Sequence, residues 1–214
     1  IDITDLNKLK KIFLTFKPDY VFHLAAQAIV KSSYENPVRT WHSNLIGTVN
    51  VLECLRFVKK KTIAVIITSD KAYKNLEIKR GYKESDVLKG YDPYGASKSS
   101  ADIAINSYYH SYFSKKNSKV LISIARAGNV IGGGDWSPNR IVTDCIKSWS
   151  KNKKATIRNP KSTRPWQHVF DVINGYTQLA SKLNRNSKLN GEAFNFGPDN
   201  RNLKVIDVLN RMKF

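Results

Sequence analysis

Apolar runs of strand length alternate along the chain with segments of helical periodicity. Three runs are rich in β-branched residues, as in strands buried on both faces: residues 19–26, 62–68 and 119–132. Apolar residues recur every three or four positions, as in helices, at 44–58, 93–113 and 170–183. The second helix is expected to begin near Gly95–Ser97, and a short strand is expected at 192–198. This alternation predicts an α/β fold with a doubly wound parallel sheet.

Polar side chains follow the strand predicted at 62–68. Thr68, Ser69, Asp70 and Lys71 come directly after the apolar run 64–67. Ligands of doubly wound sheets bind at the carboxyl ends of the strands, so these side chains are expected in a ligand crevice. The alternative is that Ser69 and Asp70 merely cap a helix, although no apolar periodicity follows at once.

A tyrosine and a lysine stand four residues apart at the start of the predicted helix 93–113. This spacing places Tyr94 and Lys98 on one helix face. A lysine beside a tyrosine favours the phenolate and lowers the tyrosine pKa, which suits a general base for a hydroxyl group. The pair alone is a weak signal, because plain helix-face residues also have this spacing. Following Ser69 and Asp70 by one strand–helix unit, it indicates an acid–base site.

The composition is that of a globular protein. The chain has 214 residues, 41% of them hydrophobic. No signal peptide is visible in the opening residues IDITDLNKLKK, and no apolar run approaches the ~20 residues that a membrane-spanning helix needs. Cys54 and Cys145 are far apart and the four histidines are scattered, which favours the cytoplasm and gives no support to a metal site. The chain opens without Met and ends at NRMKF, so we expect a fragment of a longer protein.

The net charge of +19 raises the possibility of a nucleic-acid partner. The basic runs at 115–119 and 151–154 lack interleaved aromatic residues, however, and no nucleic-acid recognition motif is present. The alternative is a lysine-rich bias on solvated faces, and we expect no nucleic acid and no membrane as partners. A small substrate that carries phosphate would be attracted by the same field.

The combination of Ser69, Tyr94 and Lys98 resembles the extended short-chain dehydrogenase/reductases, the family of NAD-dependent epimerases and dehydratases. These enzymes use a Ser/Thr–Tyr–Lys set on a Rossmann fold with NAD(P). Further motifs of this chain resemble the family's cofactor-contacting segments: DI at 2–3, HLAAQ at 23–27, NLIGT at 44–48 and RAGNVIGGGDW at 126–136.

Within that family, four motifs are similar to those of the CDP-glucose 4,6-dehydratases. They are TSDKAY, DPYGASKSSAD, RAGNVIGGGDW and IRNPKSTRPWQHV. Related dTDP-glucose dehydratases carry Asp-Glu where this chain has Asp70-Lys71. The chain departs from the family in lacking the Gly-rich GxxGxxG phosphate loop, in having Thr143 where Pro is expected, and in the stretch 169–176.

The resemblance implies a set of residues for the cofactor and another for the nucleotide sugar. Asp2 and Ile3 would hold the adenine of NAD. The other implied NAD contacts are Leu24, Ala25, Ala26, Gln27, Asn44, Thr68, Tyr94, Lys98 and Ala127. The implied substrate contacts are Asn129, Arg140, Arg158 and Arg164, with Arg164 favoured for the phosphates and Arg158 near the nucleotide. Asn44 could instead be a helix N-cap.

The implied reaction converts CDP-glucose to CDP-4-keto-6-deoxyglucose and water, with hydride carried by NAD from C4 to C6. Tyr94 would take the proton of the sugar O4, Ser69 would hydrogen-bond this oxygen, and Lys98 would hold the ribose. Asp70 would protonate the departing C6 hydroxyl. Lys71 would be either a neutral base at C5 or a charged stabiliser of the enolate, and the sequence leaves both open. The eventual product would be a deoxysugar of a surface polysaccharide.

The resemblance also implies a domain organisation and a homodimer. Residues 1–130 and 166–197 would form the Rossmann core without its first βαβ part, and 131–165 and 198–214 part of a sugar-binding domain. The Gly/Pro-rich segments 132–140 and 159–166 are expected to be substrate-facing loops or a small lid. The helices at 44–58 and 97–113 are the candidates for a four-helix dimer contact.

Two alternative functions stay open. A nucleotide-sugar 4-epimerase or reductase of the same fold would act at C4 without loss of water. A non-catalytic module binding a dinucleotide or a polyanion would explain the charge and the missing Gly-rich loop, but not the Ser–Asp and Tyr–Lys sets. Other residues have simpler explanations: His23 is expected to be structural, and Trp136 and Trp166 could pack in a lid or stack on cytosine.

Overall fold

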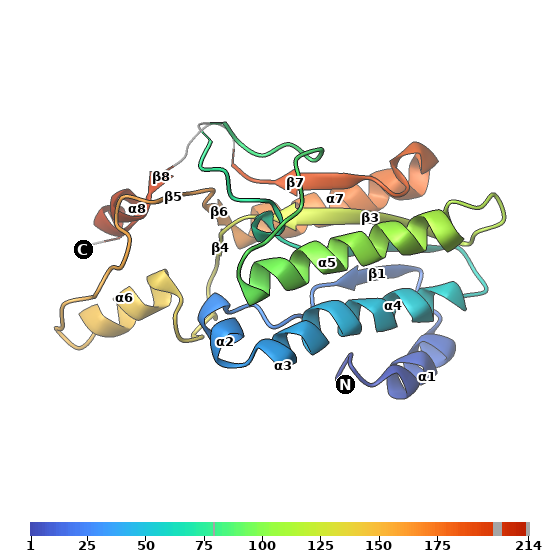
Figure 1. The fold of residues 1–214 in the computed structure, drawn as a ribbon, viewed down its shortest axis with the longest axis horizontal. Helices are drawn as coiled ribbons and strands as arrows, with labels where there is room; N and C mark the ends of the chain where they lie inside the picture. The colour runs from blue at the N-terminus through green and yellow to red at the C-terminus, as the bar shows by residue number, and fades with distance from the viewer. Residues whose placement is uncertain (79, 199–202, 213–214) are drawn as a thin grey trace. The chain divides into compact units, whose positions relative to one another are not determined.

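A computed structural model describes residues 1–78, 80–198 and 203–212, and its fold is drawn in Figure 1. The strands are β1 (Tyr20–His23), β2 (Thr62–Ile67), β3 (Val120–Ala127), β4 (Val130–Ile131), β5 (Thr163–Arg164), β6 (Gln167–His168), β7 (Ala193–Phe196) and β8 (Leu203–Lys204). The α-helices are α1 (Leu6–Phe16), α2 (Val30–Glu35), α3 (Pro37–Trp41), α4 (Gly47–Arg56), α5 (Pro93–Tyr108), α6 (Ile141–Trp149), α7 (Val169–Arg185) and α8 (Val205–Arg211). Shorter helical turns are η1 (His42–Ile46), η2 (Asp70–Ala72), η3 (Tyr109–Phe113) and η4 (Ser187–Leu189).

The chain divides into two compact units. The first consists of Ile1–Ala127 and Asn174–Asn195, and the second of Gly128–Ile173 and Phe196–Phe214. Which unit corresponds to a cofactor-binding and which to a sugar-binding domain stays a prediction.

The first unit is built on a four-stranded sheet with the order β1-β2-β3-β7. The pairs β1–β2 and β2–β3 are parallel, with Tyr20 opposite Ile63 and Ile63 opposite Leu121. In Figure 1, α4 and α5 lie side by side on one face of this sheet. The parallel sheet with flanking helices confirms the predicted fold class, and it aligns the carboxyl ends of β1, β2 and β3.

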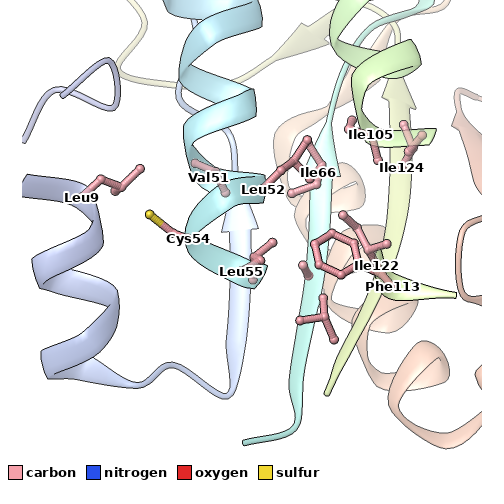
Figure 2. Close-up of a cluster of buried hydrophobic side chains, with 12 residues drawn as sticks. Leu9, Val51, Leu52, Cys54, Leu55, Ile66, Ile105, Phe113, Ile122 and Ile124 are labelled. Carbon is pink, nitrogen blue, oxygen red and sulfur yellow. The ribbon is translucent and has the colours of Figure 1, made fainter. Parts of the chain in front are cut away.

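Aliphatic side chains from the sheet and from its covering helices form the core of the first unit. Figure 2 shows how Leu52 and Leu55 of α4 point toward Ile66 of β2 and Ile122 of β3. These four side chains are completely buried, and each contributes about 1.5–3 kcal/mol relative to an exposed position. The core therefore holds α4 and α5 firmly against the strands whose ends carry the predicted site.

The structure corrects two predicted element boundaries. The helix expected to begin near Gly95–Ser97 begins at Pro93, because the Asp92 side chain accepts hydrogen bonds from the amides of Tyr94 and Gly95. Proline at the first helical position, where no amide donor is required, supports this early start. The helix expected from residue 44 is likewise preceded by α3 and η1, so that helical backbone begins at Pro37.

The second unit has two small sheets and a separate apolar cluster. β4 pairs in parallel with β6, and β5 pairs antiparallel with β8. Cys145, Val205 and Leu209 are buried together, and the Trp166 ring packs against them. This contact supports lid packing for Trp166, whereas Trp136 is 60% exposed.

Within the described part of the chain, no helix is both long enough and apolar enough to cross a membrane.

Candidate active site

The polar segment after β2 forms a capped turn. Thr68 and Ser69 are buried, Asp70 is half-buried and Lys71 is exposed. The Ser69 hydroxyl donates to the Asp70 carboxylate over 3.1 Å and accepts from the Lys71 amide over 3.2 Å. Ser69 therefore caps a helical turn, as the alternative interpretation held, but η2 has only three residues. The cap brings a carboxylate against the serine hydroxyl at the carboxyl end of a buried parallel strand.

Tyr94 and Lys98 lie one turn apart on α5, and both are buried, with 9% and 6% of their surface exposed. The Lys98 ammonium group donates to the backbone carbonyl of Ile67 over 3.3 Å. Since Ile67 is the last residue of β2, this bond places the lysine against the strand end that carries Ser69 and Asp70. The structure thus brings the predicted Tyr–Lys helix face and the predicted strand-end set together.

Helix α5 approaches the turn η2 closely because of a glycine. A β-carbon built on Gly95 would lie 2.8 Å from the carbonyl oxygen of Lys71, too close for any side chain without a backbone shift. One turn along α5, the Ser99 hydroxyl donates to the carbonyl of Ala72 over 2.7 Å and accepts from the amide of Gly90. These contacts fix the distance between Tyr94 and the segment that carries Asp70.

Burial lowers the pKa of Lys98 to about 8, from an ordinary value of 10.5. Below pH 8 the folded protein holds a buried positive charge, which costs it about 3 kcal/mol relative to the unfolded chain. Between pH 8 and 10.5 the unfolded chain still binds this proton while the folded protein has released it. The contribution of Lys98 to the free energy of unfolding therefore increases as the pH rises from 8 to 10.5.

We expect the Lys98→Met variant to be more stable than the native protein at pH 7. Removing the buried charge should gain about 3 kcal/mol, and losing the hydrogen bond to Ile67 should cost about 1 kcal/mol. Urea unfolding would measure a net gain of about 2 kcal/mol that shrinks as the pH rises from 8 toward 10.5. Lys116→Met, at an exposed lysine, is the control and should change stability by less than about 0.5 kcal/mol. A destabilised Lys98→Met at pH 7 would contradict this account.

Asn44 connects the loop after β1 to α5. Its side-chain carbonyl accepts from the Gln27 amide over 2.8 Å, and its NH₂ group donates to the Gln27 carbonyl and, over 2.9 Å, to the Ser97 hydroxyl. Ser97 in turn donates to the carbonyl of Tyr94 over 2.7 Å. Asn44 lies inside η1, so the N-cap interpretation is wrong. Its bonds hold the HLAAQ loop beside the helix that carries Tyr94.

His23 is structural, as expected. It is buried, and its Nε2 atom lies 3.0 Å from the hydroxyl of Thr48. The Thr48 hydroxyl donates its proton to the carbonyl of Asn44, so His23 is the donor in the bond between them. Burial, aided by the charge of Lys98, lowers the pKa of His23 to about 4, which keeps the imidazole neutral near pH 7.

The other residues predicted to contact a cofactor lie at or beside the strand ends. Leu24 and Ala25 follow β1 and are exposed, Ala26 is half-buried, and Ala127 ends β3. Near the chain start, the Asp2 carboxylate accepts from the amide and hydroxyl of Thr4, which lower its pKa. The half-buried Ile3 is held through its carbonyl by Asn50.

The arrangement fits a dinucleotide. Polar and small residues lie at the carboxyl ends of three adjacent parallel strands, where such cofactors bind. An ammonium group has three N–H donors, and the bond from Lys98 to Ile67 uses one of them, so further donors could hold ribose hydroxyls. Among the described residues, no three His, Cys, Asp or Glu side chains come together to hold a metal ion.

The predicted substrate residues all lie in the second unit. Arg140 is paired with Asp135 over 3.4 Å, and the half-buried Arg164 donates to the carbonyl of Thr163. Arg158 is exposed between α6 and β5, and the carbonyl of Asn129 accepts from the amide of Gln167. Their role toward a substrate stays a prediction.

Sequence reasoning missed three buried polar residues near the site. Asp102 and Arg126 form an ion pair in the first unit, and Arg126 stood out only as a charge within the apolar run 119–132. Tyr176 of α7 lies near Tyr94, and burial together with Tyr94 raises the pKa of Tyr176 to about 12. The Tyr176 phenol is therefore neutral at physiological pH.

The chain resembles known nucleotide-sugar enzymes over most of its length. A sequence profile of the family described as GDP-mannose 4,6 dehydratase matches residues 1–201. The chain is 41% identical over 211 residues to the CDP-glucose 4,6-dehydratase of Salmonella typhimurium, which covers 97% of this chain and 59% of that protein.

Solved structures show the same fold. A dTDP-glucose 4,6-dehydratase double mutant from Streptomyces venezuelae with NAD bound has a TM-score of 0.83 at 21% identity, covering 99% of this chain and 61% of that one. A UDP-glucuronic acid 4-epimerase from Bacillus cereus, in complex with UDP-glucuronic acid and NAD, has a TM-score of 0.80 at 26% identity. The match covers 98% of this chain and 62% of the epimerase. The chain thus spans about three fifths of the length of the relatives it matches.

Proposed function

The chain belongs to the GDP-mannose 4,6 dehydratase family, within the NAD-dependent epimerases and dehydratases of the extended short-chain dehydrogenase/reductases, and on this basis we propose a specific activity. The proposal is an NAD-dependent 4,6-dehydratase, a hydro-lyase that converts CDP-glucose to CDP-4-keto-6-deoxyglucose and water. The observation that carries it is the Asp70 carboxylate hydrogen-bonded to Ser69 on the strand end against which Lys98 lies. The 41% identity to a CDP-glucose 4,6-dehydratase supports the choice of substrate.

Oxidation at C4 requires a base for the O4 proton. NAD, when bound, supplies the hydride acceptor and donor of the reaction. Tyr94 takes the O4 proton, because it is a buried phenol one helical turn from Lys98 on α5. Lys98 carries a positive charge below about pH 8, and a positive charge beside a phenol favours the phenolate. Ser69 hydrogen-bonds the same sugar oxygen and keeps it oriented.

Loss of water from C5 and C6 requires an acid for the C6 hydroxyl. Asp70 in its protonated form supplies this proton and is left as a carboxylate when water departs, because it is the carboxyl group held at the strand end beside Ser69. The C4 ketone acidifies the C5 proton. Lys71, the next residue of the turn, acts at C5 either as a neutral base or as a charged stabiliser of the enolate.

A 4-epimerase is the second candidate. The similarity in fold to a UDP-glucuronic acid 4-epimerase, at 26% identity, favours it. An epimerase has no hydroxyl group to expel, however, and would leave Asp70 without a chemical role. The acidic residue in the turn is therefore the feature that favours the dehydratase.

We further propose that Asn129, Arg140, Arg158 and Arg164 contact the nucleotide sugar, with Arg164 on its phosphates. We also propose a homodimer through the helical segments 44–58 and 97–113, and exposed apolar side chains in these segments support it: Ile46, Phe57 and Ile103. The two free, buried cysteines suit a reducing compartment such as the cytoplasm.

A Gly95→Ala variant should turn over about tenfold more slowly than the native enzyme. The added β-carbon would press on the Lys71 carbonyl and move the turn that carries Asp70 away from Tyr94. Steady-state kinetics would measure the loss. Gly81→Ala is the control, since its β-carbon would meet nothing within 4 Å, and it should keep native rates. Equal rates in both variants would contradict this close approach.

The proposed activity is tested by giving the protein NAD and, in separate reactions, CDP-, dTDP-, UDP- or GDP-glucose. Mass spectrometry of the CDP-glucose product should show the loss of one water, and kcat/KM should be highest for this substrate. An inverted C4 with unchanged mass would instead establish the epimerase. Dehydration of a different nucleotide sugar would overturn only the choice of base.

A further inference from the structure

A buried ion pair lies one turn beyond Lys98 on α5. Asp102 and Arg126 are 0% and 4% exposed. The guanidinium group donates twice to the carboxylate, from Nε over 2.9 Å and from Nη2 over 2.7 Å. A bidentate pair of this kind has a fixed geometry, and its burial makes it costly to keep unless it is fully hydrogen-bonded. The pair joins α5 to β3.

The pair also holds the residue just before the acid–base turn. The hydroxyl of Thr68 donates to the Asp102 carboxylate over 3.0 Å, and Thr68 is 5% exposed. The amide of Thr68 is bonded to the carbonyl of Ala125 on β3. The position of Thr68, directly before Ser69, is therefore fixed by hydrogen bonds to both α5 and β3.

The residue just after the turn is held by the same guanidinium group. Arg126 donates from Nη1 to the Tyr73 hydroxyl over 2.7 Å and to the carbonyl of Glu84 over 2.9 Å. The Tyr73 hydroxyl donates onward to Asn195 over 2.7 Å, and its ring stacks on Tyr82 with centroids 5.1 Å apart. Tyr73 is only 4% exposed.

One ion pair thus binds the two residues that flank the segment 69–72. Asp102 holds Thr68 from α5, the helix that carries Tyr94 and Lys98, and Arg126 holds Tyr73 from β3. Burying two charges and a phenol gains little net stability, since an apolar cluster of the same volume would often serve as well. The arrangement does, however, favour a single geometry, because every hydrogen bond in it needs a particular direction between its donor and its acceptor.

We propose that Asp102 and Arg126 are positioning residues that hold the segment 69–72 in register with Tyr94 and Lys98. This inference rests on the proposed dehydratase function, in which Asp70 acts at C6 and Tyr94 acts at O4. Loss of the hydrogen bond to Thr68 or of the one to Tyr73 should let the turn move, while Tyr94 and Lys98 keep their places on α5. The elimination should then slow more than the oxidation at C4, so that reduced cofactor accumulates during turnover.

The first test uses Tyr73→Phe, which removes one hydroxyl and keeps the stacked ring. We expect kcat to fall about tenfold with unchanged KM and an accumulation of NADH absorbance, from a displacement of the acid group. Hydrogen exchange of the Ala72 and Tyr73 amides, measured without substrate, should quicken several-fold. Tyr108→Phe is the matched control, because its part-buried hydroxyl also donates to a polar partner, Glu53 over 3.2 Å.

A second variant, Thr68→Val, removes the hydrogen bond from the Thr68 hydroxyl to Asp102 and leaves the ion pair intact. It should reproduce the faster exchange and the kcat loss, and Asp102→Asn should show both more strongly if it folds. The proposal is overturned if Tyr73→Phe and Thr68→Val match Tyr108→Phe in exchange and in kcat. Because exchange needs no substrate, an enzyme that fails to dehydrate CDP-glucose but shows the faster exchange would refute the proposed function alone.

Discussion

Replacing Tyr94 by phenylalanine is expected to lower kcat for CDP-glucose by about 10²–10⁴-fold, the usual contribution of a general base. The buried ring would remain, so the fold and the packing of α5 should not change. The O4 proton, however, would lose its acceptor, because Lys98 is protonated at neutral pH and the hydroxyl of Ser69 orients the sugar oxygen but is not a base. The first oxidation step should therefore fail, and no reduced cofactor should form.

Single-turnover absorbance measurements would follow this step directly. Tyr112→Phe is the matched control, since Tyr112 lies in the turn η3 after α5 and is 39% exposed. It should keep native turnover. A Tyr94→Phe enzyme with more than about a tenth of native kcat would remove Tyr94 from the role of base.

Replacing Asp70 by asparagine is expected to block the reaction at a later point. The amide oxygen of asparagine can still accept from Ser69, so the capped turn should survive. The amide cannot give up a proton to the C6 hydroxyl, and product formation should fall by about 10²–10⁴-fold. Oxidation at C4 should continue, because Tyr94 and Lys98 are intact. Reduced cofactor should therefore persist on the enzyme.

NADH absorbance and product release, recorded in the same reaction, would separate the two steps. Asp19→Asn serves as the control, because Asp19 is exposed and its carboxylate forms a surface ion pair with Lys60 over 2.7 Å. If Asp70→Asn formed product at the native rate, the acid would be a different group. If it formed neither product nor NADH, Asp70 would act in the oxidation and not in the elimination.

The sequence predicted the sheet and the Tyr–Lys pair because both depend on local patterns. Runs of β-branched residues specify buried strands, and a spacing of four specifies a helix face. Ser69 and Asp70 were likewise found because polar residues ending a buried strand are unusual. Local patterns of this kind indicate where a side chain lies along its own strand or helix.

The hydrogen bonds and the ion pair that connect different strands and helices could not be predicted in the same way. Asn44 bonds to Ser97, and Asp102 bonds to Thr68 and Arg126, across separations of 24 to 53 residues. No periodicity encodes such partners, because they arise only when strands and helices pack. The start of α5 at Pro93 was missed for a smaller reason, since the Asp92 cap outweighed the apolar periodicity.

The most direct test of the proposed dehydratase is to follow the hydrogen on C4 of the sugar. The protein would be given NAD and CDP-glucose deuterated at C4, and the product would be analysed by NMR and mass spectrometry. The account predicts that the product has lost one water and carries the deuterium at C6. A product that has lost no water and carries the deuterium at an inverted C4 would contradict the account and establish an epimerase.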